Sequence, residues 1–360
     1  MKFLLQTQIG IEKITKLELE EKYKKSFSLD QSGYIPRRNG LLIIDWRDKF
    51  QKFWDELNSI EDAFFVLEYI KDVSKYFSLK DVIKKIDKEK IASHLKFILD
   101  QNIFTDKSLN FRIITRKRSP HNFRRIDLEE SLKNFFHSKL PKIKINDDEN
   151  NKEIWITLVK NRLIITLRLT DKTKRHRFYK HENILGSVRP SVAFAMAYVS
   201  DIRSTDTIWD PFAGAGTIPC EILLHFKFKK LLIGDIDESA IEKTKSNLKQ
   251  IHIYEKLKSK ISIRSEDFFS SKRYTKKIIT NPPFGDKHLQ PENFEEKLIE
   301  KINNIPNLQM ITLLYPKILK IPGWQLTRKF KLEILGKEAY ITVYRKIKNT
   351  VYDLEPQSIL

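Results

Sequence analysis

The 360-residue sequence has little cysteine, little glycine and no long apolar segment. Its single cysteine, Cys220, excludes an internal disulfide framework and any zinc or iron–sulfur site built from several cysteines. No apolar run approaches the ~20 residues that a membrane-spanning helix requires. The amino terminus, MKFLLQTQIG, lacks the apolar core of a secretory signal. We therefore expect a cytoplasmic protein with no membrane segment.

Acidic residues are scarce relative to basic ones. Sixty-seven Lys and Arg face 47 Asp and Glu, which leaves a formal charge of +20. Such an excess favours an anionic partner, either a nucleic acid or an acidic membrane face. A lysine-rich solvated surface would produce the same excess, so the charge alone does not decide. The 41% of apolar residues suffice for packed cores, and the length suits two or three domains.

The basic residues are clustered. Six lie between residues 111 and 125 with no acid among them, and six more lie between residues 172 and 189 with one acid, Glu182. The second cluster also holds the adjacent aromatics Phe178 and Tyr179, and a groove that follows an RNA backbone combines such charges with stacking rings. A solvated linker between domains is the alternative interpretation. The residues expected to contact RNA are Arg116, Lys117, Arg118, Arg124, Arg125, Arg175, Arg177 and Tyr179.

The first half alternates short strands and helices. We predict helices over residues 78–98 and 126–139, in addition to a helix face that begins at Ile11. A hairpin turns at Lys160 and Asn161, because apolar residues alternate on both sides of that pair. The predicted strands cover residues 3–5, 41–44, 64–70 and 109–115.

From residue 205 onward the pattern becomes strand, helix, strand, helix. This alternation predicts a doubly wound α/β sheet whose ligand crevice lies at the carboxyl ends of the strands. The expected strands cover residues 207–209, 231–234, 261–263, 277–280 and 309–314, followed by a hairpin over residues 332–335 and 340–344. The expected helices cover residues 217–226, 238–250 and 292–302.

A glycine-containing string, DPFAGAGT, follows the first of these strands at residues 210–217. Gly214 and Gly216 allow a tight turn and a close approach to a ligand, and Thr217 opens a helix whose free amides suit an anionic group. A nicotinamide-binding loop would need a third glycine where this chain has Pro219. An ordinary glycine turn would be as good an explanation if the string stood alone.

Three further strings follow the next three strands. Asp235 ends the second strand and can accept hydrogen bonds from both hydroxyls of a ribose, while Asp237 is expected to cap the next helix. Asp267 and Phe268 follow the third strand, in position to bind an adenine amine and to pack against its ring. The series of strand-tip motifs favours a ligand site over a set of unrelated turns.

The fourth strand ends in Asn281-Pro282-Pro283-Phe284-Gly285. Two consecutive prolines fix the backbone and remove two amide donors. Asn281 Oδ1 and the Pro282 carbonyl are then two acceptors for one exocyclic amine, and Phe284 offers a flat face for the base. A rigid turn would explain this string if it occurred in isolation.

In this order the strings resemble those of class I S-adenosylmethionine-dependent methyltransferases that modify exocyclic amines. The resemblance covers about residue 204 to the end. With the first half included, the chain resembles THUMP-domain RNA methyltransferases of the tRNA guanine-N2 type. The family's opening strand and helix are similar to FLLQTQIGIEKITKLELEE. Its THUMP core is similar to LNFRIITRKRSPHNFRRIDLEESLKNFF together with IWITLVKNRLIITLRL. The string before its glycine loop is similar to KRHRFY together with RPS. Relatives often carry Cys and Ser where this chain has the alanines of DPFAGAG.

The resemblance implies an α/β chain in four parts. These are a ferredoxin-like region at residues 1–75, a THUMP RNA-binding domain at 76–171, a basic linker at 172–190 and a Rossmann-like class I methyltransferase domain with a seven-stranded sheet at 191–360. The cofactor is expected to be S-adenosylmethionine, bound by Asp210, Pro211, Phe212, Gly214, Gly216, Thr217, Asp235, Ile236, Asp267, Phe268 and Asn281. The implied catalytic residues are Asn281, Pro282, Pro283 and Phe284.

The resemblance further implies a monomer that methylates N2 of a guanosine in tRNA without a metal. Three alternatives stay open on the residues alone: N2-guanine methylation of rRNA, adenine-N6 methylation of a nucleic acid, and a non-catalytic RNA-binding module.

Overall fold

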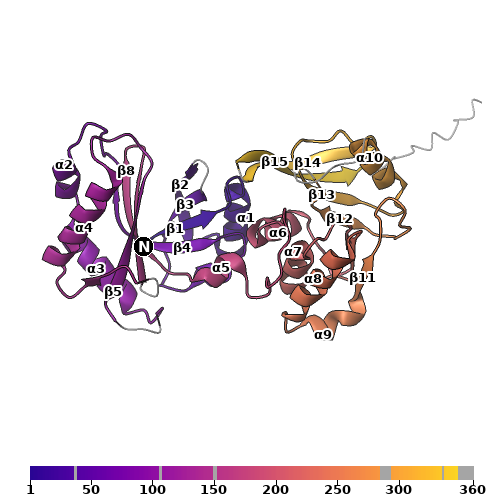
Figure 1. Cartoon of the computed structure of the whole chain (residues 1–360), viewed down its shortest axis with the longest axis horizontal. Helices are drawn as coiled ribbons and strands as arrows, with labels where there is room; N and C mark the ends of the chain where they lie inside the picture. Colours follow the sequence, from indigo (N-terminus) through magenta and orange to yellow (C-terminus); the bar gives the residue numbers. More distant parts are fainter. Residues whose placement is uncertain (36–38, 105–107, 149–151, 284–292, 335, 348–360) are drawn as a thin grey trace, which may run out of the picture. The chain divides into compact units, whose positions relative to one another are not determined.

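The computed structural model describes residues 1–35, 39–104, 108–148, 152–283, 293–334 and 336–347. The chain divides into two units, Met1–Arg177 and Phe178–Leu360 (Figure 1). The stretch 172–190, which we predicted as one linker, is divided between them, since helix α5 (Lys172–His176) belongs to the first unit.

The first unit is built on one eight-stranded sheet with the order β2-β3-β1-β4-β8-β7-β5-β6. The sheet runs through both the predicted ferredoxin-like and THUMP regions, because β4 pairs with β8. Its strands are β1 (Lys2–Thr7), β2 (Phe27–Ile35), β3 (Asn39–Trp46), β4 (Asp62–Ile70), β5 (Asn110–Lys117), β6 (Lys144–Ile145), β7 (Lys152–Val159) and β8 (Arg162–Arg168). Its helical elements before α5 are α1 (Glu12–Tyr23), η1 (Phe53–Asp55), α2 (Leu79–Lys84), α3 (Lys88–Leu99) and α4 (Arg125–Lys139).

Capping residues explain one difference from the predicted helices. The predicted helix over residues 78–98 is two helices, because Ser78 caps α2 and Asp87 caps α3 through its carboxylate. Strand β2 was not predicted, since its polar residues alternate on a half-exposed edge strand. The main core joins alternate residues of the strands, among them Phe3, Leu5 and Phe65, to the apolar faces of the helices.

The second unit contains a seven-stranded sheet with the order β11-β10-β9-β12-β13-β15-β14, in which β15 runs antiparallel to the other six strands. Its strands are β9 (Thr207–Asp210), β10 (Lys230–Asp235), β11 (Ile261–Ser265), β12 (Lys277–Thr280), β13 (Met310–Tyr315), β14 (Trp324–Ile334) and β15 (Lys337–Lys346). Its helical elements are α6 (Pro190–Val199), α7 (Thr217–His225), α8 (Glu238–Lys249), α9 (Tyr254–Leu257), η2 (Lys258–Lys260) and α10 (Phe294–Asn304).

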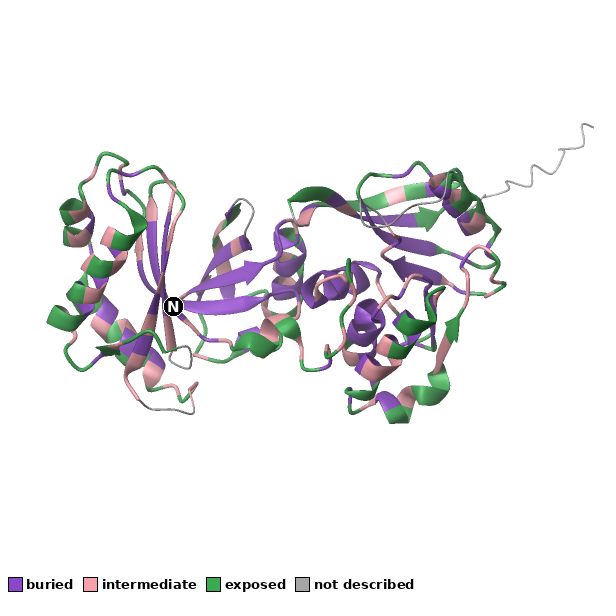
Figure 2. Ribbon diagram, viewed as in Figure 1, coloured by how far each residue is buried: buried purple, intermediate pink, exposed green. Residues whose placement is uncertain are grey.

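The central strands of this sheet are buried, as Figure 2 shows in purple. Burial on both faces is what helices packed on both sides of a parallel sheet produce, and it explains the short, continuous apolar runs in the sequence. The predicted α/β fold with a seven-stranded sheet is therefore confirmed.

Candidate active site at the strand tips of the second unit

The strand order places a switch point between β9 and β12. Strand β9 is followed along the chain by β10 on one side of the sheet, while β12 lies on its other side. Ligands of open α/β sheets bind at the carboxyl ends of the strands at such a point. The loop after β9 carries the glycine string, and the loop after β12 carries Asn281, Pro282 and Pro283. The two predicted motifs thus leave neighbouring strands.

The glycine loop has the backbone that the sequence predicts. Gly214 and Gly216 have φ angles of +56° and +76°, in the region that favours glycine. A Cβ atom on Gly216 would lie 2.8 Å from Thr244 Oγ1, so a side chain at this position would require Thr244 or the loop to shift. Thr244 also fixes the loop, because its hydroxyl donates to the Gly214 carbonyl at 2.8 Å. Thr217 then begins α7.

Asp210 is completely buried at the tip of β9. Its Oδ1 accepts hydrogen bonds from the Thr280 hydroxyl at 2.6 Å and from the Phe212 amide at 3.3 Å. Its Oδ2 has no hydrogen-bond partner among the residues that the structure describes. Burial raises the pKa of Asp210 to about 7, although the hydroxyl bond opposes the shift. A buried acceptor without a donor suits a ligand that brings a donor or a positive charge.

Asp235 and Ile236 lie at the tip of β10. Asp235 Oδ2 accepts from the Gly214 amide at 2.8 Å and Oδ1 from the Asp237 amide at 3.1 Å. Burial raises the pKa of Asp235, and these backbone bonds oppose the shift. A carboxylate has further lone pairs, so the predicted ribose contact stays open. Ile236 is 72% exposed, which leaves an apolar surface beside this carboxylate. Asp237 caps α8, as predicted.

The string after β11 differs in part from its prediction. The two carboxylate oxygens of Asp267 accept hydrogen bonds from the backbone amides of Phe269 and Ser270. Phe268 is only 2% exposed, and its ring lies 5.2 Å from those of both Trp209 and Phe212. Our expectation that Phe268 packs against an adenine ring is therefore wrong, because the hydrophobic effect holds this large side chain in the core.

The motif after β12 presents an unsatisfied acceptor. Asn281 Oδ1 is buried and, within the described part of the chain, has no hydrogen-bond partner. Pro282 is buried and Pro283 half-buried. Phe284, the fourth predicted catalytic residue, lies outside the described residues. A buried amide oxygen without a donor costs free energy unless a ligand supplies the donor.

A segment that the sequence analysis treated as linker packs on the glycine loop. Asn247 accepts from the Glu182 amide at 2.9 Å, and its Nδ2 donates to the Ala215 carbonyl at 2.8 Å. Ile184 fills the space beside Gly214, and Ser187 Oγ lies 3.1 Å from Thr217 Oγ1. Sequence reasoning missed these residues because they form no motif and meet only in the folded chain.

The first basic cluster is only partly exposed, since Arg116 and Lys117 are half-buried, and it makes contacts within the protein. The Arg116 guanidinium lies 3.9 Å from the centre of the Trp155 ring, and Lys117 lies 5.8 Å from that of Phe123. Arg118 is exposed. Arg124 and Arg125 form ion pairs of 2.7 Å with acids one turn along α4. Exposed pairs of this kind contribute little, so both guanidinium groups can exchange to phosphate.

Residues of the second basic cluster make contacts within the protein. In the first unit, Arg175 lies 3.6 Å from the Glu61 carboxylate, and Arg177 donates to the Asn58 carbonyl at 2.6 Å. In the second unit, Tyr179 is completely buried, with its hydroxyl donating to Glu221 Oε1 at 2.7 Å. Tyr179 therefore has no exposed face for an RNA base, and this expectation is wrong. Its neighbour Phe178 is 51% exposed.

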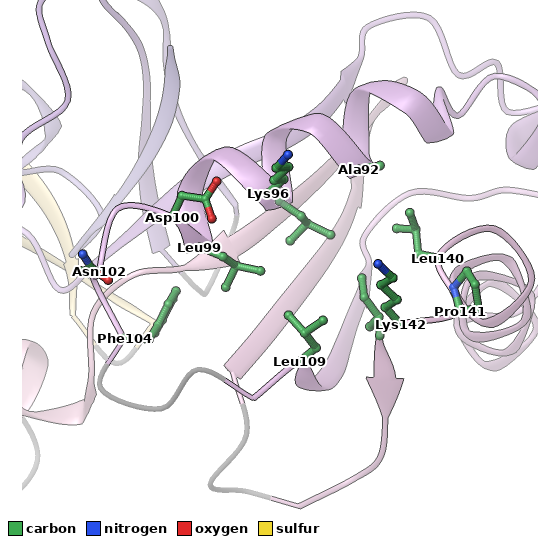
Figure 3. A pocket seen from close by; sticks show the side chains of 12 residues that line it. Ala92, Lys96, Leu99, Asp100, Asn102, Phe104, Leu109, Leu140, Pro141 and Lys142 are labelled. Carbon is green, nitrogen blue, oxygen red and sulfur yellow. The ribbon is translucent and has the colours of Figure 1, made fainter.

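A separate cavity of about 720 Å³ lies in the first unit between α3 and the segment that follows α4 (Figure 3). Leu99, Phe104, Leu109 and Leu140 give it an apolar lining, with Lys96 and Lys142 at its edge. No strand-tip residue of the second unit lines it. Within the described ranges, no cluster of His, Cys, Asp and Glu could hold a metal, and no helix is long and apolar enough to cross a membrane.

Residues 177–309 match the family described as "RMKL-like, methyltransferase domain". They include the glycine loop, Asp235, Asp267 and Asn281. The region of this chain that carries the strand-tip site is therefore similar to a methyltransferase domain.

Two curated relatives are similar in sequence. The tRNA (guanine(6)-N2)-methyltransferase of Methanocaldococcus jannaschii is 23% identical over 59% of this chain and 53% of its own length. The tRNA (guanine(10)-N2)-dimethyltransferase of Methanothermobacter thermautotrophicus is 28% identical over 46% of this chain and 50% of its own length. The chain thus spans about half the length of the curated relatives it matches.

Among solved structures, TrmN from Thermus thermophilus has a TM-score of 0.71 with 18% identity, over 96% of this chain and 99% of its own. The two chains therefore share their fold through both units.

Proposed function

We propose that the protein transfers a methyl group from S-adenosylmethionine to the exocyclic N2 amine of a guanosine in tRNA. The observation that carries the proposal is the buried Asn281 Oδ1 at the switch point, which has no hydrogen-bond partner among the described residues and lies beside the strand whose loop holds Gly214 and Gly216. The printed names of the two curated relatives support both the N2 atom and the tRNA substrate.

The site fits S-adenosylmethionine in three respects. The positive φ angles and the blocked Cβ position in the glycine loop make a cradle for the methionine end. Asp210 Oδ2 is a buried acceptor that suits a cationic group. The Asp235 carboxylate and the exposed Ile236 suit a ribose and an adenine edge, and Asp267 suits the adenine amine. When bound, the cofactor supplies an electrophilic methyl group on a sulfonium.

The chain's own residues then act on the amine. The lone pair of a guanine N2 amine is delocalised into the ring, so the amine is a poor nucleophile. Hydrogen bonds from its two protons to Asn281 Oδ1 and the Pro282 carbonyl hold it in place and favour the pyramidal nitrogen of the transition state. The prolines fix both acceptors before the base arrives. The guanosine must leave its stack to reach them, at a cost of a few kcal/mol.

The RNA is held mainly by the first unit. Arg118, Arg124 and Arg125 present exposed charge, and such contacts give affinity through the release of counterions. The predicted THUMP domain, a monomeric state and a cytoplasmic location are parts of the same proposal.

The test is incubation of the full chain with S-adenosylmethionine and, separately, bulk tRNA, rRNA and DNA, followed by digestion to nucleosides. We expect N2-methylguanosine from tRNA. If only rRNA yielded N2-methylguanosine, the substrate would be rRNA and not tRNA. Formation of methyladenosine would refute the assignment of guanine as the target base. If calorimetry found no binding of S-adenosylmethionine, the chain would be a non-catalytic RNA-binding module.

A further inference from the structure

The backbone ladder between β9 and β12 opens before the ends of the two strands. Their pairing stops at Trp209 and Ile278. On the outer sides the ladders continue, since Asp210 pairs with Ile233 of β10 and Thr280 with Leu313 of β13. The switch-point opening therefore begins after Trp209 and Ile278, and Asp210 and Thr280 lie beyond these last paired residues, one position out of register with each other.

A side-chain hydrogen bond spans this opening. Thr280 Oγ1 donates to Asp210 Oδ1 at 2.6 Å, and the two residues are 1% and 0% exposed. Bonds to a carboxylate are short and strong, particularly away from water. The same oxygen accepts the Phe212 amide at the start of the glycine loop. One carboxylate oxygen thus joins the cofactor loop to the residue that immediately precedes Asn281.

We propose that Thr280 is a positioning residue for methyl transfer: its bond to Asp210 holds Asn281 where Oδ1 receives the target amine beside the glycine loop. The inference rests on the function proposed above. Asn281 Oδ1 has no hydrogen-bond partner of its own in the described residues, so its position follows from the main chain that leaves Thr280. Without the bond, Thr280 keeps its backbone pairing with β13 but, among the described residues, loses its hydrogen bond to Asp210, so the ends of β9 and β12 can move apart.

The simpler view is that the Thr280 hydroxyl only satisfies a buried carboxylate. Loss of the hydroxyl would then lower stability and leave the chemistry of the folded protein unchanged. A positioning role instead lowers kcat, because a misplacement of ~1 Å at a reacting centre costs up to ~100-fold in rate. Binding of tRNA, which depends mainly on the first unit, should not change.

The experiment compares Thr280→Val, which removes the hydroxyl at nearly constant volume, with Thr280→Ser, which keeps it. In the full chain we expect Thr280→Val to lower kcat about tenfold or more, with KM for tRNA and the Kd for S-adenosylhomocysteine within about threefold. Thr280→Ser should restore most of kcat. Thr280→Ala replaces Thr280→Val if the latter does not fold.

The inference would be overturned if Thr280→Val had a kcat close to that of the wild type, or if Thr280→Ser lost as much kcat as Thr280→Val. It would also be overturned if cofactor affinity in Thr280→Val fell as much as kcat. The comparison uses whichever methylated nucleoside the wild type forms, so an error in the base or RNA assignment leaves it intact. A wild-type chain that methylates nothing would overturn both proposals.

Discussion

The polar residues proposed to act in the two units differ in burial. Arg118, Arg124 and Arg125 of the first unit are exposed, whereas Asp210 and Thr280 of the second are 0% and 1% exposed. Exposed charges act on RNA through a screened, roughly additive field. Buried groups at a crevice act through fixed geometry in a low dielectric, where one lost contact is costly. Single substitutions should therefore have large effects in the second unit and small ones in the first.

The largest effect is expected for Asn281→Ala. Removing the acceptor of the target amine should lower the rate of methyl transfer by about 100- to 1000-fold, the size seen when one positioned group of an active site is lost. Cofactor affinity should stay within a small factor in calorimetry. Asn304→Ala, an exposed position at the end of α10, is the matched control and should behave as the wild type. An unchanged rate in Asn281→Ala would remove the basis for the acceptor role.

The next prediction distinguishes the cost of a left-handed backbone from the cost of a steric clash in the glycine loop. Gly216→Ala and Gly323→Ala both place a Cβ on a backbone with φ near +80°, but only the Gly216 position is blocked, by Thr244. Both variants should lose about 1 kcal/mol of folding stability from the left-handed backbone. Only Gly216→Ala should also weaken S-adenosylhomocysteine binding, by about tenfold or more, since the loop must shift to admit the methyl group. Equal cofactor affinities in the two variants would argue against a cofactor role for the loop.

Folding stability should also depend on pH through Asp210. Because the pKa of Asp210 is raised from 3.8 to about 7 in the folded protein, its favourable contribution is present below pH 4 and is lost as the pH rises through 7. Asp210→Asn lacks this dependence. The stability of Asp210→Asn relative to wild type should thus increase between pH 5 and pH 8, by about 2 kcal/mol. Thermal unfolding at the two pH values measures it, and a constant difference would mean that the carboxyl titrates normally.

The smallest effects belong to the first unit. Arg118→Gln should weaken tRNA binding modestly and reduce the slope of log affinity against log salt by up to ~1. Arg125→Gln, which also breaks the pair with Glu129, should lower the slope by no more than that. Titrations over a range of salt concentrations measure both. If either variant lost as much activity as a substitution of a buried active-site residue, the contrast between the two units would be contradicted.

Contiguous motifs were the part of the site that could be predicted from the sequence. The glycine loop, the capping role of Asp237 and the apolar runs of the strands are visible because each depends on residues close together in the chain. Whether an aromatic side chain is buried or exposed was not predictable in this way. Phe268 and Tyr179 are buried by neighbours distant in sequence, Trp209 and Glu221. Likewise, the Thr280–Asp210 bond joins residues 70 positions apart and appears in no local pattern.

The central claim is that the exocyclic N2 amine of guanosine receives the methyl group. Once the modified nucleotide has been mapped, a tRNA transcript with inosine at that position alone lacks this amine and keeps the rest of the base. We expect full methylation of the guanosine transcript and none of the inosine transcript, with both bound at similar affinity. Methylation of the inosine transcript at that nucleotide would contradict it.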